Sequence, residues 1–332
     1  MKKKNFWLEL KKNKKPILAL APMAGFTDSA FRQLCGKYGA DVLYSEMASA
    51  TALYYSDNAK DKTQRQKIKN ATLELLKFNP KLEKNYVVQL FGSNPEHFAV
   101  AAKIVSRDVK PDGIDINFGC PVSKVIKQGA GSDLMKNLPK ARAVIEAVLK
   151  NTDLPVSIKI RAKSGEVDAL KFLQFISDLP ISALMIHGRT VNQGFAGEPD
   201  CKLIKEARHH FSGIILANGG VNSLASGLRI LYDSQADGLG LARGVLGRPW
   251  FFKELKDNKE KKPSFPEILK LMLSHAVSNE KIKGAGSLIE LRKHLVWYVQ
   301  GIDGASRLRE QLVRVSKVQE LKEIILKYQK SL

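Results

Sequence analysis

Several features are scarce or missing in this chain of 332 residues. It has only three cysteines, Cys35, Cys120 and Cys201, spaced too widely for a disulfide framework or a metal-ligand cluster. We therefore expect no metal and a reducing, cytoplasmic location. No apolar run approaches the roughly 20 residues that span a bilayer, so we expect no membrane contact. The basic N-terminus contains no apolar core before Pro16, which argues against a signal peptide.

Acidic residues are also scarce relative to basic ones. The chain carries 54 Lys and Arg against 33 Asp and Glu, a formal net charge of +21. A surface this basic favours a polyanionic partner such as nucleic acid. A general enrichment in solvated surface lysines would give the same net charge without any such partner. The charge alone therefore does not decide between a nucleic-acid partner and a general lysine enrichment.

What the sequence does contain is a regular series of short, apolar, β-rich runs. Eight occur, at Ile17–Leu20, Asp41–Ser45, Tyr86–Phe91, Gly113–Phe118, Val156–Arg161, Ala183–His187, Gly213–Ala217 and Gly238–Leu241. Helical periodicity lies between them, for example over 95–105, 139–149 and 223–231. Alternating strands and helices predict parallel pairing with right-handed crossovers. Eight successive units predict a (β/α)8 TIM barrel rather than a doubly wound open sheet.

The sequence changes character after Phe252. Residues 253–263 are charged and end at a proline, so we interpret them as a linker between a barrel of residues 1–252 and a helical domain of residues 264–332. Helical periodicity over 267–277, 287–299, 305–315 and 318–328 predicts a small antiparallel bundle. We expect the lysine-rich segment 1–15 to be a frayed arm.

A barrel of this kind places its active site at the C-terminal ends of the strands. The polar residues there are Gln89, Asn117, Cys120, Lys159, Arg161, His187, Arg189, Asn218 and Arg243. The segment 113–121 is the most informative, because Ile114 and Ile116 alternate with polar residues until Gly119 and Pro121 end the run around Cys120. A cysteine at a strand tip can act as a proton donor or a nucleophile, and the alternative is a small buried hydrophobe.

Glycines cluster in the two loops that follow the last barrel strands, in residues 217–221 and 240–248. Glycine amides can approach phosphate oxygens closely, a helix starting near Ser223 would add its dipole, and Arg243 could add a charge-assisted fork. Because these loops commonly bind phosphate in barrels, they predict a phosphorylated cofactor. Lys159 has two interpretations: it could form a Schiff base, or it could remain cationic and stabilise negative charge on a reduced ring.

Seven motifs occur in order along the chain. They are Ala21-Pro22-Met23-Ala24-Gly25-Phe26-Thr27-Asp28, Ser45-Glu46-Met47, Val88-Gln89-Leu90-Phe91-Gly92, Ile116-Asn117-Phe118-Gly119-Cys120-Pro121, Ser157-Ile158-Lys159-Ile160-Arg161, Ile186-His187-Gly188-Arg189-Thr190 and Gly247-Arg248-Pro249-Trp250. With the tail around Arg292-Lys293-His294, this ordered set resembles the tRNA-dihydrouridine synthases over roughly residues 16–330. It is most similar to their bacterial B-type branch.

The resemblance implies an enzyme that uses NADPH to reduce FMN, and FMN to reduce specific tRNA uridines to 5,6-dihydrouridine. It implies a hydride from FMN N5 to C6 of the base and a proton from Cys120, the general acid, to C5. The implied cofactor-binding residues are Met23, Ala24, Gly25, Gln89, Asn117 and Lys159 near the flavin ring, and His187, Asn218, Gly219, Gly220, Ala242 and Arg243 near the phosphate. The family usually has glycine where Ala242 stands.

The implied partner is tRNA, bound by a protein that we expect to be a monomer. The candidate tRNA or substrate contacts are Arg161, Arg189, Arg292, Lys293, Arg307, Arg309 and Arg314, and we expect Arg307 and Arg314 to share one helical face. Extracting a stacked base costs a few kcal/mol, which RNA contacts would offset. We also expect a barrel truncated after Lys262 to keep FMN and lose tRNA.

Two other functions are compatible with parts of the sequence. A flavin barrel that acts on a free small molecule, such as a dihydroorotate-type dehydrogenase or an ene-reductase, shares the phosphate loops and the cysteine. It does not require the helical tail or the basic surface. A non-catalytic RNA-binding protein on a degenerate barrel would account for the charge but not for Cys120 and the flavin-contact set. The stretch 58–85 is longer and more basic than is usual in the family, and the sequence assigns it no role.

Overall fold

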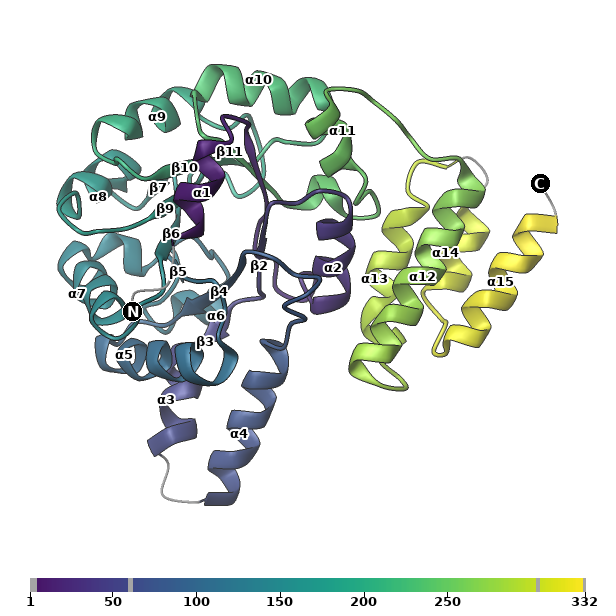
Figure 1. The fold of residues 1–332 in the computed structure, drawn as a ribbon, viewed down its shortest axis with the longest axis horizontal. Helices are drawn as coiled ribbons and strands as arrows, with labels where there is room; N and C mark the ends of the chain where they lie inside the picture. The colour runs from purple at the N-terminus through teal and green to yellow at the C-terminus, as the bar shows by residue number, and fades with distance from the viewer. Residues whose placement is uncertain (1–4, 59–61, 303–304, 331–332) are drawn as a thin grey trace.

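Eight parallel strands close into a barrel at the centre of the molecule (Figure 1). The computed structural model describes residues 5–58, 62–302 and 305–330. The barrel strands are β1 (Ile17–Leu20), β2 (Val42–Tyr44), β4 (Tyr86–Phe91), β5 (Gly113–Asn117), β6 (Val156–Arg161), β9 (Ala183–His187), β10 (Ile214–Asn218) and β11 (Gly238–Leu241). Each pairs in parallel with the next barrel strand along the chain, and β11 pairs with β1. The predicted TIM barrel is therefore confirmed.

Helices surround this barrel in the order that the sequence predicts. They are α2 (Ser29–Lys37), α3 (Ala50–Asn58), α5 (Pro95–Ile104), α7 (Leu138–Lys150), α8 (Ala169–Phe175), α9 (Cys201–Glu206), α10 (Leu224–Ser234) and α11 (Phe251–Asp257). The helices predicted at 95–105, 139–149 and 223–231 correspond to α5, α7 and α10. Short elements lie in the loops that follow the C-terminal ends of the strands. They are β3 (Ala48–Ser49), α6 (Ser123–Ile126) and the β7–β8 hairpin (Lys163–Ser164 with Val167–Asp168).

The N-terminal segment closes one end of the barrel, and the prediction of a frayed arm is wrong from residue 5 onward. Asn5 caps helix α1 (Phe6–Lys12), which lies across the barrel in Figure 1. Trp7 is fully buried among inward-facing strand residues such as Ile17 and Met185. Burying an aromatic side chain this large stabilises the fold by several kcal/mol relative to leaving it exposed. This gain outweighs the tendency of the lysine-rich segment to stay in solvent. Residues 1–4 lie outside the described part of the chain.

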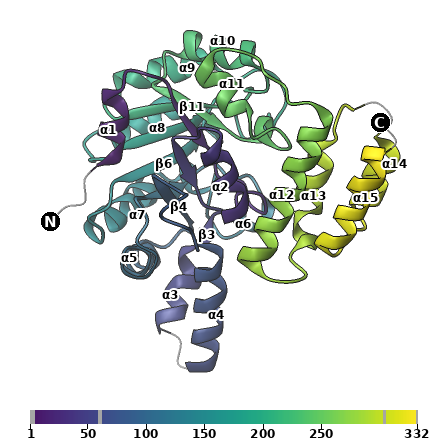
Figure 2. The ribbon, with the colours of Figure 1, turned by 45° about the vertical axis from the view of Figure 1, so that its right-hand side comes forward.

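The stretch 58–85, to which the sequence assigned no role, contributes a second helix after β2. Helix α4 (Lys62–Leu75) lies alongside α3, and the two project from the barrel as a hairpin (Figures 1 and 2). Leu76 at its base is fully buried, and Tyr86 donates a hydrogen bond from its hydroxyl to the Leu76 carbonyl at 3.1 Å. Lys69 pairs with Asp108 at 3.2 Å, which ties the hairpin to the end of α5.

The C-terminal residues form four helices with a core of their own. They are α12 (Phe265–Lys283), α13 (Leu288–Tyr298), α14 (Ser306–Leu312) and α15 (Val318–Lys330). Helix α12 continues past the predicted end at Val277 and stops only at Gly284, whose φ of +91° favours glycine. Helix α14 ends at Leu312, so Arg314 lies beyond it. The prediction that Arg307 and Arg314 share a helical face is therefore wrong.

This helical bundle packs against α2, beside the barrel, in both views (Figures 1 and 2). Leu34 of α2 and Tyr38, its C-cap residue, pack against the core of the bundle, and Trp250 is part of that core. Lys283 of α12 pairs with Asp28, the N-cap of α2, at 2.8 Å. A side chain at Gly247 would place its Cβ 2.2 Å from the backbone carbon of Trp297, so only glycine allows this approach.

Two buried histidines at this seam predict a pH dependence of stability. Burial lowers the pKa of His275 to about 4 and of His294 to about 3. The groups that face them are Asp28, Lys283, Lys293 and, by hydrogen bond to His275, Tyr298. In the unfolded chain these histidines have a pKa of about 6.5, well above their pKa in the folded protein. Lowering the pH therefore protonates them mainly in the unfolded state and stabilises that state. We expect each histidine to remove about 2 kcal/mol of stability at pH 5.

Denaturation of the wild type and of a His275→Gln, His294→Gln variant at pH 7.5 and pH 5 measures this effect. The difference between the two proteins isolates the histidines, because burial also raises the pKa of Asp115 to about 6, which acts in the opposite direction. A variant that loses as much stability on acidification as the wild type would show that the histidines do not contribute.

Candidate active site

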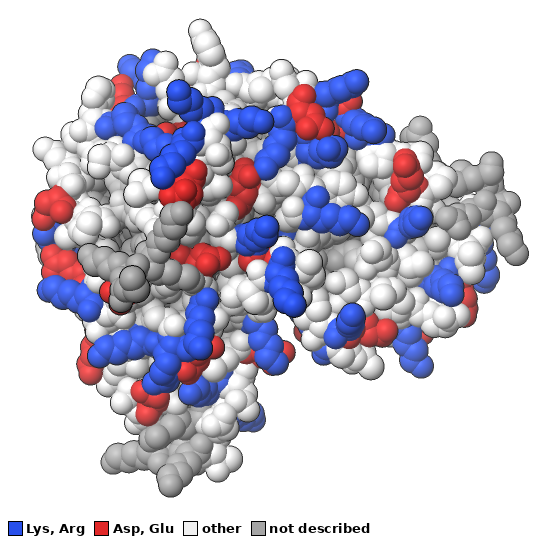
Figure 3. All heavy atoms as spheres, viewed as in Figure 1, with Lys and Arg blue, Asp and Glu red and all other residues white. Residues whose placement is uncertain are grey.

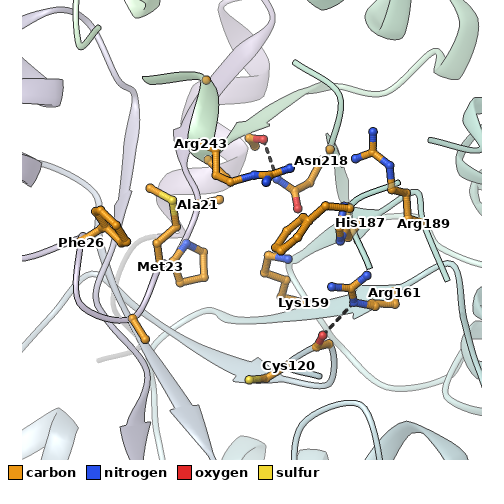
Figure 4. Close-up of a pocket in the computed structure, with 18 of the residues that line it drawn as sticks. Ala21, Met23, Phe26, Cys120, Lys159, Arg161, His187, Arg189, Asn218 and Arg243 are labelled. Atoms are coloured by element: carbon orange, nitrogen blue, oxygen red, sulfur yellow. Dashed lines mark hydrogen bonds between the residues drawn. The ribbon is translucent and has the colours of Figure 1, made fainter. Parts of the chain in front are cut away.

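A cavity of about 550 Å³ opens at the C-terminal ends of the barrel strands. Inward-facing strand residues and the following loops build it, because alternate side chains of a strand point to the same side. Figure 4 shows how Cys120, Lys159, His187, Asn218 and Arg243 converge on it from different strands. The predicted site residues that line it are Met23, Ala24, Gln89, Asn117, Cys120, Lys159, Arg161, His187, Arg189, Asn218, Gly219, Gly220, Ala242 and Arg243.

One predicted cofactor-binding residue, Gly25, is not part of the cavity lining. Its amide donates a hydrogen bond to Glu46, and a side chain there would meet the Lys293 ammonium, 2.9 Å away. Conversely, sequence reasoning missed the cavity residues Phe195 and Trp297. The only signal for Phe195 in the sequence was its position, as an aromatic residue in the loop after a barrel strand. Trp297 comes from α13, and no pattern in the sequence links it to the barrel.

Cys120 is half-buried and lies in a loop that Asn117 organises. The Asn117 Oδ1 atom accepts hydrogen bonds from the backbone amides of Gly119 at 3.0 Å and Cys120 at 2.9 Å. Arg161 holds the same loop from the other side, donating from Nε to the Gly119 carbonyl at 3.0 Å (Figure 4). The thiol is therefore presented to the cavity by a loop with two independent anchors.

The cavity is strongly cationic. Lys159, Arg161, His187, Arg189 and Arg243 line it, whereas none of the described lining residues is Asp or Glu. Burial, followed by repulsion from Arg161, lowers the pKa of Lys159 to about 8. Burial and the surrounding cations lower the pKa of His187 to about 2, so this imidazole is neutral at pH 7. Such a field favours an anionic ligand or negative charge that develops during a reaction.

Two of the arginines already hydrogen-bond to backbone carbonyls. Besides Gly119, Arg161 donates to the carbonyls of Thr190 and Gly194, both at 3.0 Å. Arg189 donates to the Gly197 carbonyl at 2.8 Å. Both side chains are buried, and their hydrogen bonds hold the loop of residues 188–200 in place. This role in positioning the loop does not depend on any ligand that they also contact.

The other end of the cavity is a glycine cradle. Gly219 and Gly220 have φ values of +101° and +74°, and a Cβ on Gly219 would lie 2.5 Å from the His187 ring. Among the described residues, neither amide donates to a protein acceptor. The Arg243 guanidinium stacks on Phe195, 3.9 Å from the ring centroid, at the edge of this cradle. Ala242 also lines the cavity, with backbone angles φ −122° and ψ −111° that lie outside the α and β regions.

The bundle contributes to the first loop of the site. His294 hydrogen-bonds through Nε2 to the Phe26 carbonyl at 3.2 Å, and the Lys293 ammonium lies 5.1 Å from the Phe26 ring centroid. Arg292 donates to the carbonyls of Val315 and Arg314, and Arg309 donates to that of Val299. Arg314 pairs with Glu310 at 2.8 Å, while Arg307 is exposed. Lysines and arginines are spread over barrel and bundle on the face in Figure 3, so charge alone marks no binding surface there.

Comparison with known proteins identifies the family. The sequence model described as dihydrouridine synthase (Dus) matches residues 19–332. The chain belongs to the dihydrouridine synthase family. It is 34% identical to tRNA-dihydrouridine synthase B of Shewanella oneidensis, over 86% of this chain and 87% of that protein. It is 32% identical to the probable tRNA-dihydrouridine synthase 1 of Synechocystis, over 92% and 84%. The resemblance stated from the motifs is confirmed.

Solved structures match the fold of this dihydrouridine synthase family member. A histamine dehydrogenase from Rhizobium sp. 4-9 superposes with a TM-score of 0.53 at 12% identity, over 85% of this chain and 49% of that one. An amine oxidase for 6-hydroxypseudooxynicotine from Pseudomonas geniculata N1 gives 0.51 at 12% identity, over 95% and 64%. At such identities the likeness concerns the fold alone. In the described ranges no helix is long and apolar enough to cross a membrane, and no group of three potential metal ligands occurs.

Proposed function

We propose that this protein reduces the C5–C6 double bond of specific uridines in tRNA to 5,6-dihydrouridine, with FMN as cofactor, NADPH as reductant and Cys120 as proton donor. The observation that carries the proposal is the convergence of Cys120, a cationic wall and a glycine cradle on one cavity in a member of the dihydrouridine synthase family. The relative from Shewanella oneidensis is named a tRNA-dihydrouridine synthase, and the one from Synechocystis a probable tRNA-dihydrouridine synthase.

The residues present fit FMN. The amides of Gly219 and Gly220 and the Arg243 guanidinium would hold its phosphate, with the neutral His187 beside them. Gln89, Asn117 and Lys159 would contact the ring, and Met23 and Ala24 would cover it. Gly25, which is not part of the cavity lining, would act through the shape of its loop. When bound, the flavin supplies the hydride that uridine reduction requires.

The protein's own residues would stabilise the developing negative charge and supply the proton. Hydride addition at C6 of uracil moves negative charge toward C5 and O4. With a pKa of about 8, Lys159 is mostly cationic at pH 7 and stabilises this charge. Cys120 then gives its proton to C5. Because the part of the chain that the structure describes holds no second α/β domain for NADPH, we propose that NADPH and tRNA use this cavity in turn.

The helical bundle would bind tRNA together with the rim of the cavity. Lys293 beside the first loop and the exposed Arg307 are the cations of the bundle best placed for phosphate contact. Arg292, Arg309 and Arg314 have protein partners and could contribute with their remaining N–H groups. Arg161 and Arg189 would shape the substrate loop and, through their remaining N–H groups, would also contact the substrate in the cavity. We propose a monomer in which residues 258–263, the part of the predicted linker 253–263 that follows α11, join the barrel to the tRNA-binding bundle.

The decisive experiment is mass spectrometry of tRNA from cells that lack this protein, followed by an assay of the purified protein on that tRNA. We expect one or more dihydrouridines to be missing and to be restored by the protein with NADPH. Turnover of free pyrimidines with none on tRNA would instead support a small-molecule flavin enzyme.

Arg243→Ala provides a prediction for the cofactor. We expect the wild type to purify yellow, with non-covalent FMN, and the variant to bind FMN about tenfold to a hundredfold more weakly. This is the loss expected for a charge-assisted hydrogen bond of about 1.5–3 kcal/mol. Fluorescence titration of apoprotein with FMN measures it, with Arg107→Ala as a control because Arg107 is exposed at the end of α5. A colourless wild type that cannot be reconstituted with FMN would refute the proposed function.

A further inference from the structure

A buried carboxylate below the cavity has no part in the proposed chemistry. Asp115 is fully buried in β5, two residues before Asn117, and both side chains therefore point into the barrel. Its Oδ1 atom accepts a hydrogen bond from the Ser157 hydroxyl at 2.6 Å. Its Oδ2 atom accepts one from the Gln89 Nε2 amide at 2.7 Å. Asp115 thus links the neighbouring strands β4 and β6 through their inward-facing side chains.

The hydrogen bonds from Asp115 continue toward the cavity in one direction. An ionised carboxylate only accepts, so Gln89 must turn its NH2 group toward Asp115 and its carbonyl oxygen away. That oxygen, Oε1, accepts from the Asn117 Nδ2 amide at 2.8 Å. The Oδ1 atom of Asn117 is then left to accept the two backbone amides of the Cys120 loop. Reversing either side-chain amide would put a donor against a donor.

A carboxylate at this depth requires an explanation. Burial raises the pKa of Asp115 to about 6, despite the opposing hydrogen bonds from Ser157 and Gln89 and the charge of Lys159. The ionised form therefore costs free energy at pH 7, and a neutral asparagine would occupy nearly the same space. What asparagine lacks is the property of accepting at both ends, which is the property that sets the direction of the chain.

We propose that Asp115 positions Cys120: it is the accepting end of a buried hydrogen-bond chain, Asp115–Gln89–Asn117, that holds the loop carrying the thiol. The role of the thiol rests on the proposed function, whereas the chain itself does not. Asp115 touches neither the cavity nor the reacting atoms, so it is a positioning residue.

Hydrogen exchange in the apoprotein tests the chain independently of any activity. Asp115→Asn keeps the shape but lets Gln89 adopt either orientation. We expect the amide hydrogens of Gly119 and Cys120 to exchange about tenfold faster, the change that corresponds to roughly 1.4 kcal/mol. Asp168→Asn is the matched control, because Asp168 is a helix N-cap outside the cavity and asparagine caps equally well. Unchanged exchange at Gly119 and Cys120 in Asp115→Asn would overturn the proposal.

Kinetics of the holoenzyme then connect the chain to Cys120. We expect Asp115→Asn to lower the rate of dihydrouridine formation about tenfold, with tRNA KM and flavin reduction by NADPH little changed. In a Cys120→Ala background the same substitution should cause no further loss, because the group that it positions is gone. Additive losses in the double variant would mean a general structural role and overturn the proposal. If the wild type forms no dihydrouridine, the proposed function fails, and the exchange experiment still decides whether the chain holds the loop.

Discussion

Replacing Cys120 by alanine is expected to lower the rate of dihydrouridine formation by about 10²–10⁴, the usual cost of losing a general acid. Binding of FMN and its reduction by NADPH should be unchanged, because neither step requires the thiol. The loop should keep its shape, since Asn117 and Arg161 hold it through backbone atoms. The Cys120 side chain therefore contributes chemistry that its neighbours cannot replace.

Anaerobic stopped-flow experiments separate the two half-reactions. Bleaching of the flavin by NADPH reports the first, and reoxidation by unmodified tRNA reports the second. Cys201→Ala is the matched control, because Cys201 is also half-buried but begins α9, outside the cavity lining. A parallel fall of both half-reactions in Cys120→Ala would show that Cys120 is structural or acts with NADPH.

Deleting the bundle by ending the chain at Lys262 is expected to abolish tRNA binding and to weaken FMN binding as well. The sequence alone suggested that the barrel would keep its cofactor. The structure indicates otherwise, because Trp297 of the bundle lines the cavity and His294 holds the Phe26 carbonyl in its first loop. Leu34, Tyr38 and Trp250 would also lose their apolar cover. FMN titration and circular dichroism of the truncated protein measure the two effects.

Charge variants of the full-length chain separate RNA binding from these structural contacts. Replacing Lys293, Arg307 and Arg314 by glutamine should weaken tRNA binding and lower the slope of log affinity against log salt by about 2–3. FMN affinity should not change. The control replaces Lys150, Lys202 and Lys253, exposed lysines of barrel helices, with the same loss of charge. Equal salt slopes for the two triple variants would show that the bundle shields the barrel without binding tRNA.

The strands were predictable because their signal is local. Alternation within 113–118 and the turn residues at Gly119 and Pro121 depend only on neighbours in the chain, and β5 occupies Gly113–Asn117. Helix α1 was not predictable in the same way. The lysines around Trp7 indicate a solvated arm, and the burial of Trp7 is visible only once the strands form a barrel end that it can close.

The site shows the same division. That Gln89, Asn117, Lys159, His187 and Asn218 would meet follows from their places at the ends of parallel strands, and the cavity brings them together. The direction of the chain through Asp115 does not follow from the sequence. It depends on the register that sets Gln89 opposite Asp115 and Asp115 opposite Ser157. Arg161 and Arg189, which we predicted as substrate or tRNA contacts, also hydrogen-bond to loop carbonyls, and only the structure shows these bonds.

By itself, the sequence determined the order of strands and helices, the family and the set of polar residues at one end of the barrel. These properties follow from short-range periodicity and from motifs, which neighbouring residues encode. Only the tertiary structure decided that Trp7 closes the barrel, that Trp297 of the bundle lines the cavity while His294 holds its first loop, and that Asp115 anchors the Cys120 loop. Each of these depends on contacts between residues far apart in the chain, which exist only after strand register and helix packing have brought them within hydrogen-bonding or van der Waals distance.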